Sequence, residues 1–184
     1  YVDDEGRQST FSHDDEAAGP GWYEVRLPDD GVDVQIIATT RGALHTYTFD
    51  EGTAPTLVFD MSHALGEDHA VDGFVSVEGA HLAGYTRVVG SYSERFGGVR
   101  TWFAADVDPA PIEVESWSED RVGTALRWTD GTTSVQLRVA VSSVDAAGAE
   151  ANLAAEHPDF DALARRAEAD AAWMTLLSAA RVRG

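Results

Sequence analysis

Residues 11–23 bring together side-chain types that can do chemistry. They read Phe11-Ser12-His13-Asp14-Asp15-Glu16-Ala17-Ala18-Gly19-Pro20-Gly21-Trp22-Tyr23. A histidine beside carboxylates can orient toward a hydroxyl group or carry a proton. The Gly-Pro-Gly triplet predicts a sharp bend, and a polar cluster on such a bend is a place where a rigid scaffold can present a site. The alternative is an ordinary turn with solvated acids.

Other residues that could do chemistry are scattered along the chain. His63 and His69 flank a polar loop, but neither an HExxH motif nor a close His-x-His spacing occurs, so we expect no metal site in this segment. The sequence contains neither a glycine-rich phosphate loop after a strand nor a G-x-S-x-G motif. Nucleotide-binding and serine-hydrolase functions therefore have no support.

Four tryptophans leave two roles open. A tryptophan face can stack on the apolar face of a sugar ring, but large aromatic side chains also fill the cores of β-sandwiches. Core packing is the more frequent role for such residues. The four are Trp22, Trp102, Trp117 and Trp128.

The composition limits the partners of the chain. Its 184 residues include 32 acids and 13 bases, a net charge of −19, and every base is an arginine. Such a charge repels nucleic acid and anionic membranes, whereas a neutral polar ligand such as a sugar is not penalised. The chain has no cysteine, and no apolar run approaches the length of a membrane helix. We expect it to be a segment of a longer protein.

Alternation of apolar and polar residues predicts a series of strands after an irregular polar segment at residues 1–21. No helical pattern interrupts the series, so the strands should form antiparallel sheets, and they are too many for one small sheet. The economical arrangement is a mainly β, antiparallel two-sheet β-sandwich. The predicted strands are 22–27, 32–40, 43–49, 56–61, 73–78, 81–89, 99–107, 122–128 and 135–141.

The last two predicted strands carry the strongest turn signal. Asp130-Gly131 lies between the alternating runs at 122–128 and 135–141. An Asp-Gly pair between two such runs is typical of a two-residue β-hairpin. The sequence therefore predicts that these two strands pair with each other.

Helical spacing begins after residue 141. Ala146, Ala149 and Leu153 share one face of a first predicted helix, and Asp159 is the expected N-cap of a second one. The second helix has a predicted apolar stripe of Phe160, Leu163, Ala164, Ala167, Ala171 and Met174. We therefore divide the chain into a β-sandwich domain at 1–141 and a helical linker at 142–184.

The segment 11–23 also resembles the Phe-Ser-His-x-x-Glu-x-Ala-x-Pro-Gly-aromatic-Tyr motif of the N-terminal domain of glycoside hydrolase family 92, a family of α-mannosidases. It departs from the family at Asp15, where asparagine is more frequent, and at Trp22, where tyrosine is usual. A second similarity lies at 141–153, which ends in Ala149-Glu-Ala-Asn152-Leu153. The resemblance runs from Phe11 to about Val182 and is looser in the middle.

This resemblance implies a galactose-mutarotase-like supersandwich followed by two linker helices, which lead to an (α/α)6 catalytic domain in the same chain. It implies inverting hydrolysis of α-mannosidic bonds in mannose-containing glycans. In the full-length enzyme, calcium assists this hydrolysis, and this segment does not bind the calcium. The resemblance also implies a bacterial, secreted or cell-surface location. Because the (α/α)6 catalytic domain carries the acid, the base and the metal-contacting groups in this family, we assign no catalytic residue and no metal ligand in this segment.

Under this resemblance, four residues are candidates for contacts with substrate or with the neighbouring domain: Ser12, His13, Glu16 and Trp22. Glycoside hydrolysis requires two carboxyl groups beside the scissile bond. The acid pairs Asp14/Asp15, Asp29/Asp30 and Asp106/Asp108 lie in turns or at strand ends, where we expect solvated carboxylates.

Two other functions stay open. One is a free-standing carbohydrate-binding sandwich without catalytic activity, although a terminal helical pair needs a surface on which to pack. The other is a mutarotase-like enzyme, which would need a histidine and a glutamate facing one sugar inside the sandwich. The sequence does not place such a pair.

Overall fold

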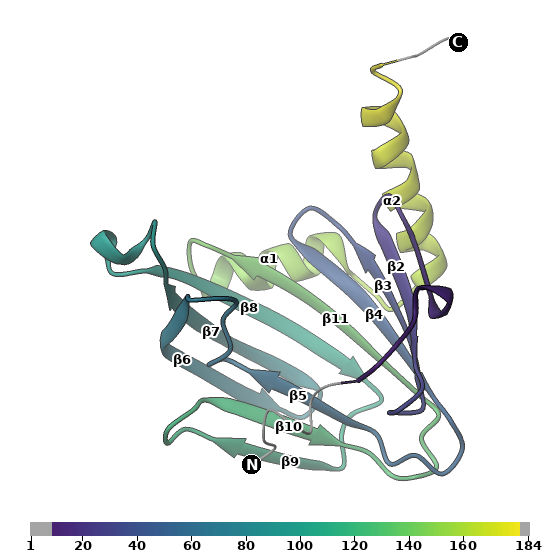
Figure 1. The fold of residues 1–184 in the computed structure, drawn as a ribbon, viewed down its shortest axis with the longest axis horizontal. Coiled ribbons are helices and arrows are strands. Elements are labelled where there is room, and N and C mark those ends of the chain that lie inside the picture. Colours follow the sequence, from purple (N-terminus) through teal and green to yellow (C-terminus); the bar gives the residue numbers. More distant parts are fainter. Residues whose placement is uncertain (1–8, 181–184) are drawn as a thin grey trace.

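The computed structural model describes residues 9–180, which form two antiparallel sheets followed by two helices (Figure 1). The predicted two-sheet β-sandwich with two C-terminal helices is confirmed. The outer ends of the two predicted domains lie outside the described residues, at 1–8 and 181–184. The same is true of Val182, where the resemblance ends. The division at residue 141 into two domains stays a prediction.

The larger sheet has eight strands in the order β1-β2-β3-β4-β11-β8-β7-β6, and the smaller has three in the order β5-β10-β9. In the larger sheet the strands are Glu16–Gly19 (β1), Trp22–Leu27 (β2), Val32–Ala38 (β3), Gly42–Phe49 (β4), His69–Glu78 (β6), His81–Val89 (β7), Val99–Asp108 (β8) and Ser134–Ser142 (β11). In the smaller sheet they are Thr56–Asp60 (β5), Glu113–Trp117 (β9) and Gly123–Arg127 (β10). Two short 3-10 helices are His13–Asp15 (η2) and Glu94–Phe96 (η3).

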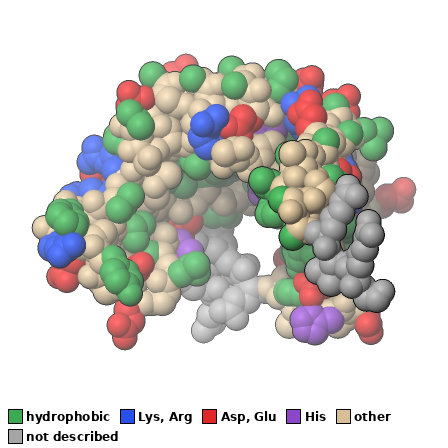
Figure 2. All heavy atoms as spheres, turned by 90° about the horizontal axis from the view of Figure 1, so that it is seen from above, with side chains coloured by type: hydrophobic (Ala, Val, Ile, Leu, Met, Phe, Trp, Pro, Cys, Tyr) green, Lys and Arg blue, Asp and Glu red, His purple; other side chains and the backbone are tan. Residues whose placement is uncertain are grey.

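The main hydrophobic core lies between the two sheets. Alternate residues of each strand point to the same face, so every second side chain of β4, β8 and β11 reaches this core. Its buried members are Leu82, Phe103, Ala105, Val107, Leu126, Trp128, Val135 and Leu137. The three strands of the smaller sheet cover only part of the eight-stranded sheet, and the molecule is hollowed on one side in Figure 2.

The predicted hairpin at Asp130-Gly131 is wrong. β10 pairs with β5 and β9, whereas β11 pairs with β4 and β8, so the connection crosses from one sheet to the other. Both strands face the same core, where Leu126 and Trp128 meet Val135 and Leu137. Alternation identified the apolar face of each strand correctly, but it carries no information about the partner strand.

The prediction of an irregular segment up to residue 21 is also wrong. Ser12 caps the short helix η2, and β1 then pairs along its whole length with β2, from Glu16 opposite Val25 to Gly19 opposite Trp22. Strand β1 is short and contains only alanine, glycine and one acid, so it lacks the β-branched and aromatic residues that reveal a strand in sequence. β9 was missed as well, and β6 begins four residues earlier than predicted.

Helix α1, Ala146–Glu156, covers the opposite face of the larger sheet. Its buried residues Ala149 and Leu153 pack on Ala104 and Ala140, as the predicted helical face required. Asp145 caps the helix, since its carboxylate accepts a hydrogen bond from the Gly148 amide at 2.7 Å.

Helix α2, Ala162–Leu177, stands beside β2 and β3 and projects away from the sandwich (Figure 1). Its N-cap is Asp161, two residues after the predicted Asp159. The predicted apolar stripe is not the packed face: Leu163 is 85% exposed and Met174 64% exposed, while Arg165 and Ala169 are buried. Arg165 tolerates burial because its guanidinium donates to the Glu156 carbonyl oxygen and pairs with Glu168. No helix in the described part of the chain is long and apolar enough to cross a membrane.

Candidate functional site

The turn that opens the motif is held by Ser12. Its hydroxyl accepts from the Asp14 amide at 3.2 Å, and the Asp15 carboxylate accepts from the Ser12 amide at 3.0 Å and from the Ser12 hydroxyl at 2.9 Å. These hydrogen bonds from Ser12, the backbone one foremost, lower the pKa of Asp15. Ser12, a predicted site residue, therefore shapes the turn through its own side chain.

Glu16 lies next in the chain and joins two other motif residues. Its carboxylate contacts the His13 Nδ1 atom at 2.5 Å through one oxygen and accepts from the Tyr23 hydroxyl at 2.6 Å through the other. The two strands bring Glu16 and Tyr23 together, because Ala18 pairs with Tyr23 and the residue two places earlier shares its face. The hydrogen bond from Tyr23, and then that from His13, lower the pKa of Glu16, and the same bond raises the pKa of Tyr23.

Because both oxygens of Glu16 face donors, the carboxylate is ionised and fixes the orientation of His13. An ionised acceptor at Nδ1 requires a proton on Nδ1, which leaves Nε2 of the neutral ring as an acceptor. The His13 side chain is 96% exposed, whereas that of Glu16 is only 25% exposed. The arrangement presents one oriented imidazole to the outside of the molecule.

The structure brings Ser12, His13 and Glu16 together but separates Trp22 from them. Neighbouring residues of a strand point to opposite faces, so Trp22 lies on the face that carries the helices. There the Arg166 guanidinium lies 3.8 Å from the centre of the indole ring. Tyr23 was missed as a site residue, although the predicted turn at 19–21 could have indicated that it returns beside Glu16.

The other tryptophans have structural surroundings. Trp128 belongs to the main core, and its indole N–H donates to the Pro109 carbonyl oxygen at 2.8 Å. Trp102 packs against the cluster under α1. Trp128, one of the four tryptophans considered for sugar stacking, is therefore a core residue.

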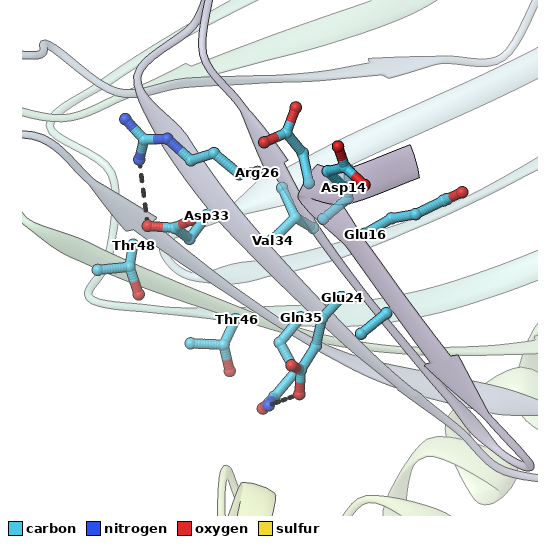
Figure 3. A pocket seen from close by; sticks show the side chains of 12 residues that line it. Asp14, Glu16, Glu24, Arg26, Asp33, Val34, Gln35, Thr46 and Thr48 are labelled. Carbon is cyan, nitrogen blue, oxygen red and sulfur yellow. Dashed lines mark hydrogen bonds and ion pairs between the residues drawn. The ribbon is translucent and has the colours of Figure 1, made fainter. Parts of the chain in front are cut away.

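A polar groove of about 630 Å³ adjoins the motif on the helix-bearing face of the larger sheet (Figure 3). Cross-strand pairs form its floor: the Gln35 amide donates to Glu24 at 2.8 Å, and Arg26 pairs with Asp33 at 3.1 Å. Thr46 and Thr48 continue these rows on β4, and Asp14 and Asp15 lie at the rim. Most of its lining side chains are hydrophilic, and the acids among them outnumber the single arginine, which suits a neutral polyhydroxylated ligand better than an anion.

A second cavity of about 640 Å³ lies between the β1–β2 turn and helix α2. Its lining is largely apolar and includes Trp22, Ile36, Ala169, Trp173 and Leu176. Gly21, at φ +82°, passes so close to Ala169 and Trp173 that an added Cβ atom would come within about 3 Å of both. The Pro-Gly turn of the motif is therefore fitted to the helix.

No group of three or more histidine and carboxylate side chains in residues 9–180 is arranged to hold a metal ion. Three carboxylates of the motif and groove already accept hydrogen bonds: Asp15 from Ser12, Glu16 from His13 and Tyr23, and Glu24 from Gln35. This set of donors does not fit a calcium site, which needs six or more free oxygen ligands.

Each predicted acid pair has a member with a structural partner. Asp15 is bound to Ser12, Asp29 accepts from the Thr10 amide at 2.9 Å, and Asp106 pairs with both His81 and Arg138. The assignment of no catalytic residue to these pairs stays a prediction.

Comparison with known proteins gives one family and a consistent fold. The model of the glycosyl hydrolase family 92 N-terminal domain matches residues 2–142. No curated protein sequence matches the chain.

Several solved structures share the fold. The family GH92 α-mannosidase BT3965 from Bacteroides thetaiotaomicron superposes with a TM-score of 0.81 at 20% identity, over 98% of this chain and 27% of that one. The family GH92 inverting mannosidase BT2199 from Bacteroides thetaiotaomicron VPI-5482 gives 0.81 at 21% identity, over 98% and 25%. The GH92 family glycosyl hydrolase ccman5 gives 0.79 at 24% identity, over 92% and 25%. The chain thus spans about a quarter of the length of these proteins.

Proposed function

The chain belongs to the glycosyl hydrolase family 92 N-terminal domain family, and from this premise we propose that it is the sandwich domain of an α-mannosidase that docks on a catalytic domain and adds carbohydrate contacts to its cleft. The observation that carries the proposal is the exposed His13 imidazole fixed by Glu16 and Tyr23. A surface histidine held in one orientation can hydrogen-bond a sugar hydroxyl with little loss of conformational entropy.

In this proposal the three side chains have different roles. His13 contacts the sugar through Nε2, Glu16 fixes the tautomer, and Tyr23 positions Glu16. Hydrolysis itself, which we propose to be inverting, requires two free carboxyl groups that the acid pairs described above do not supply. We place the acid, the base and any calcium in the catalytic domain of the full-length protein.

Helix α2 offers a surface for that domain. Its exposed face carries Leu163, Met174 and Leu177, beside the half-exposed Trp173. Large apolar side chains grouped on one element are typical of an interface. The solved relatives are about four times as long as the aligned region, which supports a further domain as the occupant of this surface.

A hydrolysis assay tests the division of labour. The segment alone should not cleave an aryl α-mannoside, whereas the full-length protein should. In the full-length protein, His13→Ala should raise KM severalfold with a smaller change in kcat, because a contact to the ground-state sugar is lost. His69→Ala, a change at an exposed histidine of β6, is the matched control and should alter neither constant.

Two outcomes would count against the proposal. Turnover of the mannoside by the segment alone would contradict the assignment of catalysis to another domain. An unchanged KM in His13→Ala, together with a lower melting temperature of the full-length protein, would assign His13 to the domain interface instead of the sugar.

A second candidate function is a carbohydrate-binding module that needs no partner, and the polar groove beside β2, β3 and β4 favours it (Figure 3). Titration calorimetry of the segment with mannose and galactose separates the two. Measurable affinity that is lost in Gln35→Ala would support the module, and absence of heat would leave the domain proposal. The mutarotase-like alternative has less support, because His45 and Glu16 lie three strands apart, about 14 Å, on their shared face.

A further inference from the structure

His81 links helix α1 to the larger sheet. It is the first residue of β7 and pairs directly with Asp106 on β8. Its Nδ1 atom lies 2.8 Å from an Asp106 carboxylate oxygen, and its Nε2 atom lies 3.0 Å from a Glu150 carboxylate oxygen on α1. One imidazole ring thus bridges two carboxylates that belong to two different layers of the fold.

We propose that His81 is a proton-dependent latch, which holds α1 to the sheet when the imidazole is charged and releases Glu150 when the imidazole is neutral. The proposal does not depend on the function proposed above. It follows from the bridge between Asp106 and Glu150 and from the chemistry of the two ring nitrogens.

The two protonation states differ in what the ring can donate. The imidazolium carries a proton on each nitrogen and can donate to both carboxylates, while the neutral ring carries only one proton. In the neutral state, one nitrogen lone pair faces a carboxylate oxygen, and that contact becomes repulsive. The bridge is therefore complete only in the charged state.

The other partners of the two carboxylates indicate which of the two His81 contacts is lost when the imidazole becomes neutral. Asp106 is also bound by Arg138, at 2.7 and 3.0 Å, so it keeps a cationic partner when His81 is neutral. Among the described residues, His81 is the hydrogen-bond partner of the Glu150 side chain, which is about half exposed. Loss of the proton should therefore free Glu150 and leave Asp106 in place.

Charged residues of every neighbouring element flank His81. They are Glu78 opposite it on β6, Asp106 on β8, Arg138 on β11 and Glu150 on α1. Partial burial opposes the charged form, but the hydrogen bond to Asp106 and the charge of Glu150 outweigh it and raise the pKa of His81. A raised pKa means that the latch is fully present below the pKa of free histidine and is lost as the pH rises through the pKa in the folded chain.

Release does not unfold the helix. Ala149 and Leu153 remain packed on Ala104 and Ala140, and the Asp145 cap is unaffected. The change should be confined to the side of α1 that faces β7, where the helix can separate from the sheet more often.

Amide hydrogen exchange combined with histidine NMR tests the latch. The His81 ring resonance should titrate above the usual value of histidine. After correction for intrinsic rates, the protection of α1 amides should fall severalfold as the pH passes through that titration. In Glu150→Gln the pH dependence of α1 protection should disappear, because an amide can accept from the charged ring or donate to the neutral one. His69→Gln is the control and should behave like the unchanged chain.

Two results would overturn the proposal. One is a His81 titration at or below the usual value of histidine. The other is a fall of α1 protection with pH that is the same in the unchanged chain and in Glu150→Gln. Glu150 is exposed, so its substitution leaves the fold intact and both results remain readable.

Discussion

Glu16 accounts for most of the geometry of the motif at the scale of single residues. Its two carboxylate oxygens bind His13 and Tyr23, so one acid connects the 3-10 turn, the edge strand and its neighbour. Sequence reasoning selected His13 and Glu16 because acids flank the histidine. It gave no role to Tyr23, because the partner of a carboxylate depends on how two strands pair.

His45 allows a prediction about pH at the same scale. It lies on β4, and its ring stacks on Tyr47, with the hydroxyl of Tyr47 3.1 Å from Nδ1. Burial, and then the nearby His157, lower the pKa of His45 from 6.5 to about 4. The imidazole is therefore neutral in the folded chain at pH values where an unfolded chain binds a proton.

The stability associated with neutral His45 is complete above pH 6.5 and is lost as the pH falls toward about 4. The loss should reach up to ~3 kcal/mol. We expect urea denaturation at several pH values to show a weaker acid destabilisation in His45→Gln than in the unchanged chain. His69→Gln should keep the full effect, and equal pH profiles for all three chains would contradict the assigned pKa.

At the scale of elements, the β1–β2 turn and helix α2 are fitted to each other through Gly21. Gly21 has a φ of +82°, and an added Cβ would lie 3.0 Å from the Ala169 Cβ atom. Gly52 has a nearly identical φ of +83° but no atom within 4 Å of an added Cβ. The two glycines differ in their surroundings and share the same backbone strain.

We expect Gly52→Ala to lower the free energy of unfolding by about 1 kcal/mol, the penalty of a left-handed alanine. Gly21→Ala should lose a further 1 kcal/mol or so from the contact with α2. Chemical denaturation of both variants measures the difference. Equal losses would mean that the turn and the helix are not in contact.

The crossing between the two sheets gives a second prediction at this scale. Gly131 does not adopt a positive φ, and an added Cβ would meet only the Thr129 hydroxyl at 4.0 Å. In a hairpin turn of type I′ the glycine needs a positive φ, and alanine there would be strained. Gly131→Ala should therefore change the free energy of unfolding by less than ~0.5 kcal/mol. A loss above about 1 kcal/mol would favour the hairpin that the sequence suggested.

At the scale of the whole molecule, the net charge of −19 opposes the compact state. Red acidic side chains occur in several places on the face in Figure 2 and do not form one patch. Their repulsion acts over about 10 Å at 0.1 M ionic strength and is screened at higher salt.

We expect the urea midpoint of the chain to rise when NaCl increases from ~0.05 M to ~0.5 M, because screening relieves this repulsion. Arg127→Gln should increase the salt dependence, since Arg127 pairs with Glu113 and Glu115 on β9. A midpoint that falls with salt would show that the ion pairs outweigh the net charge.

The sequence by itself determined the class of the fold, the apolar face of the strands that alternation revealed, and the family. Alternation places Val135 and Leu137 in a core wherever β11 pairs, and helical spacing placed Ala149 and Leu153 on the sheet. These features follow from local periodicity, which depends on the chain alone. The motif at 11–23 is likewise a local signal, and three of its four candidate residues lie together in the structure.

Only the tertiary structure decided which distant segments meet. It separated β10 from β11, although Asp130-Gly131 favours a hairpin, because both strands bury apolar faces against one core from opposite sides. It turned the predicted stripe of α2 outward, placed Trp22 under Arg166, and put His81 between Asp106 and Glu150. Such contacts depend on packing between residues far apart in the chain, and no local pattern records them.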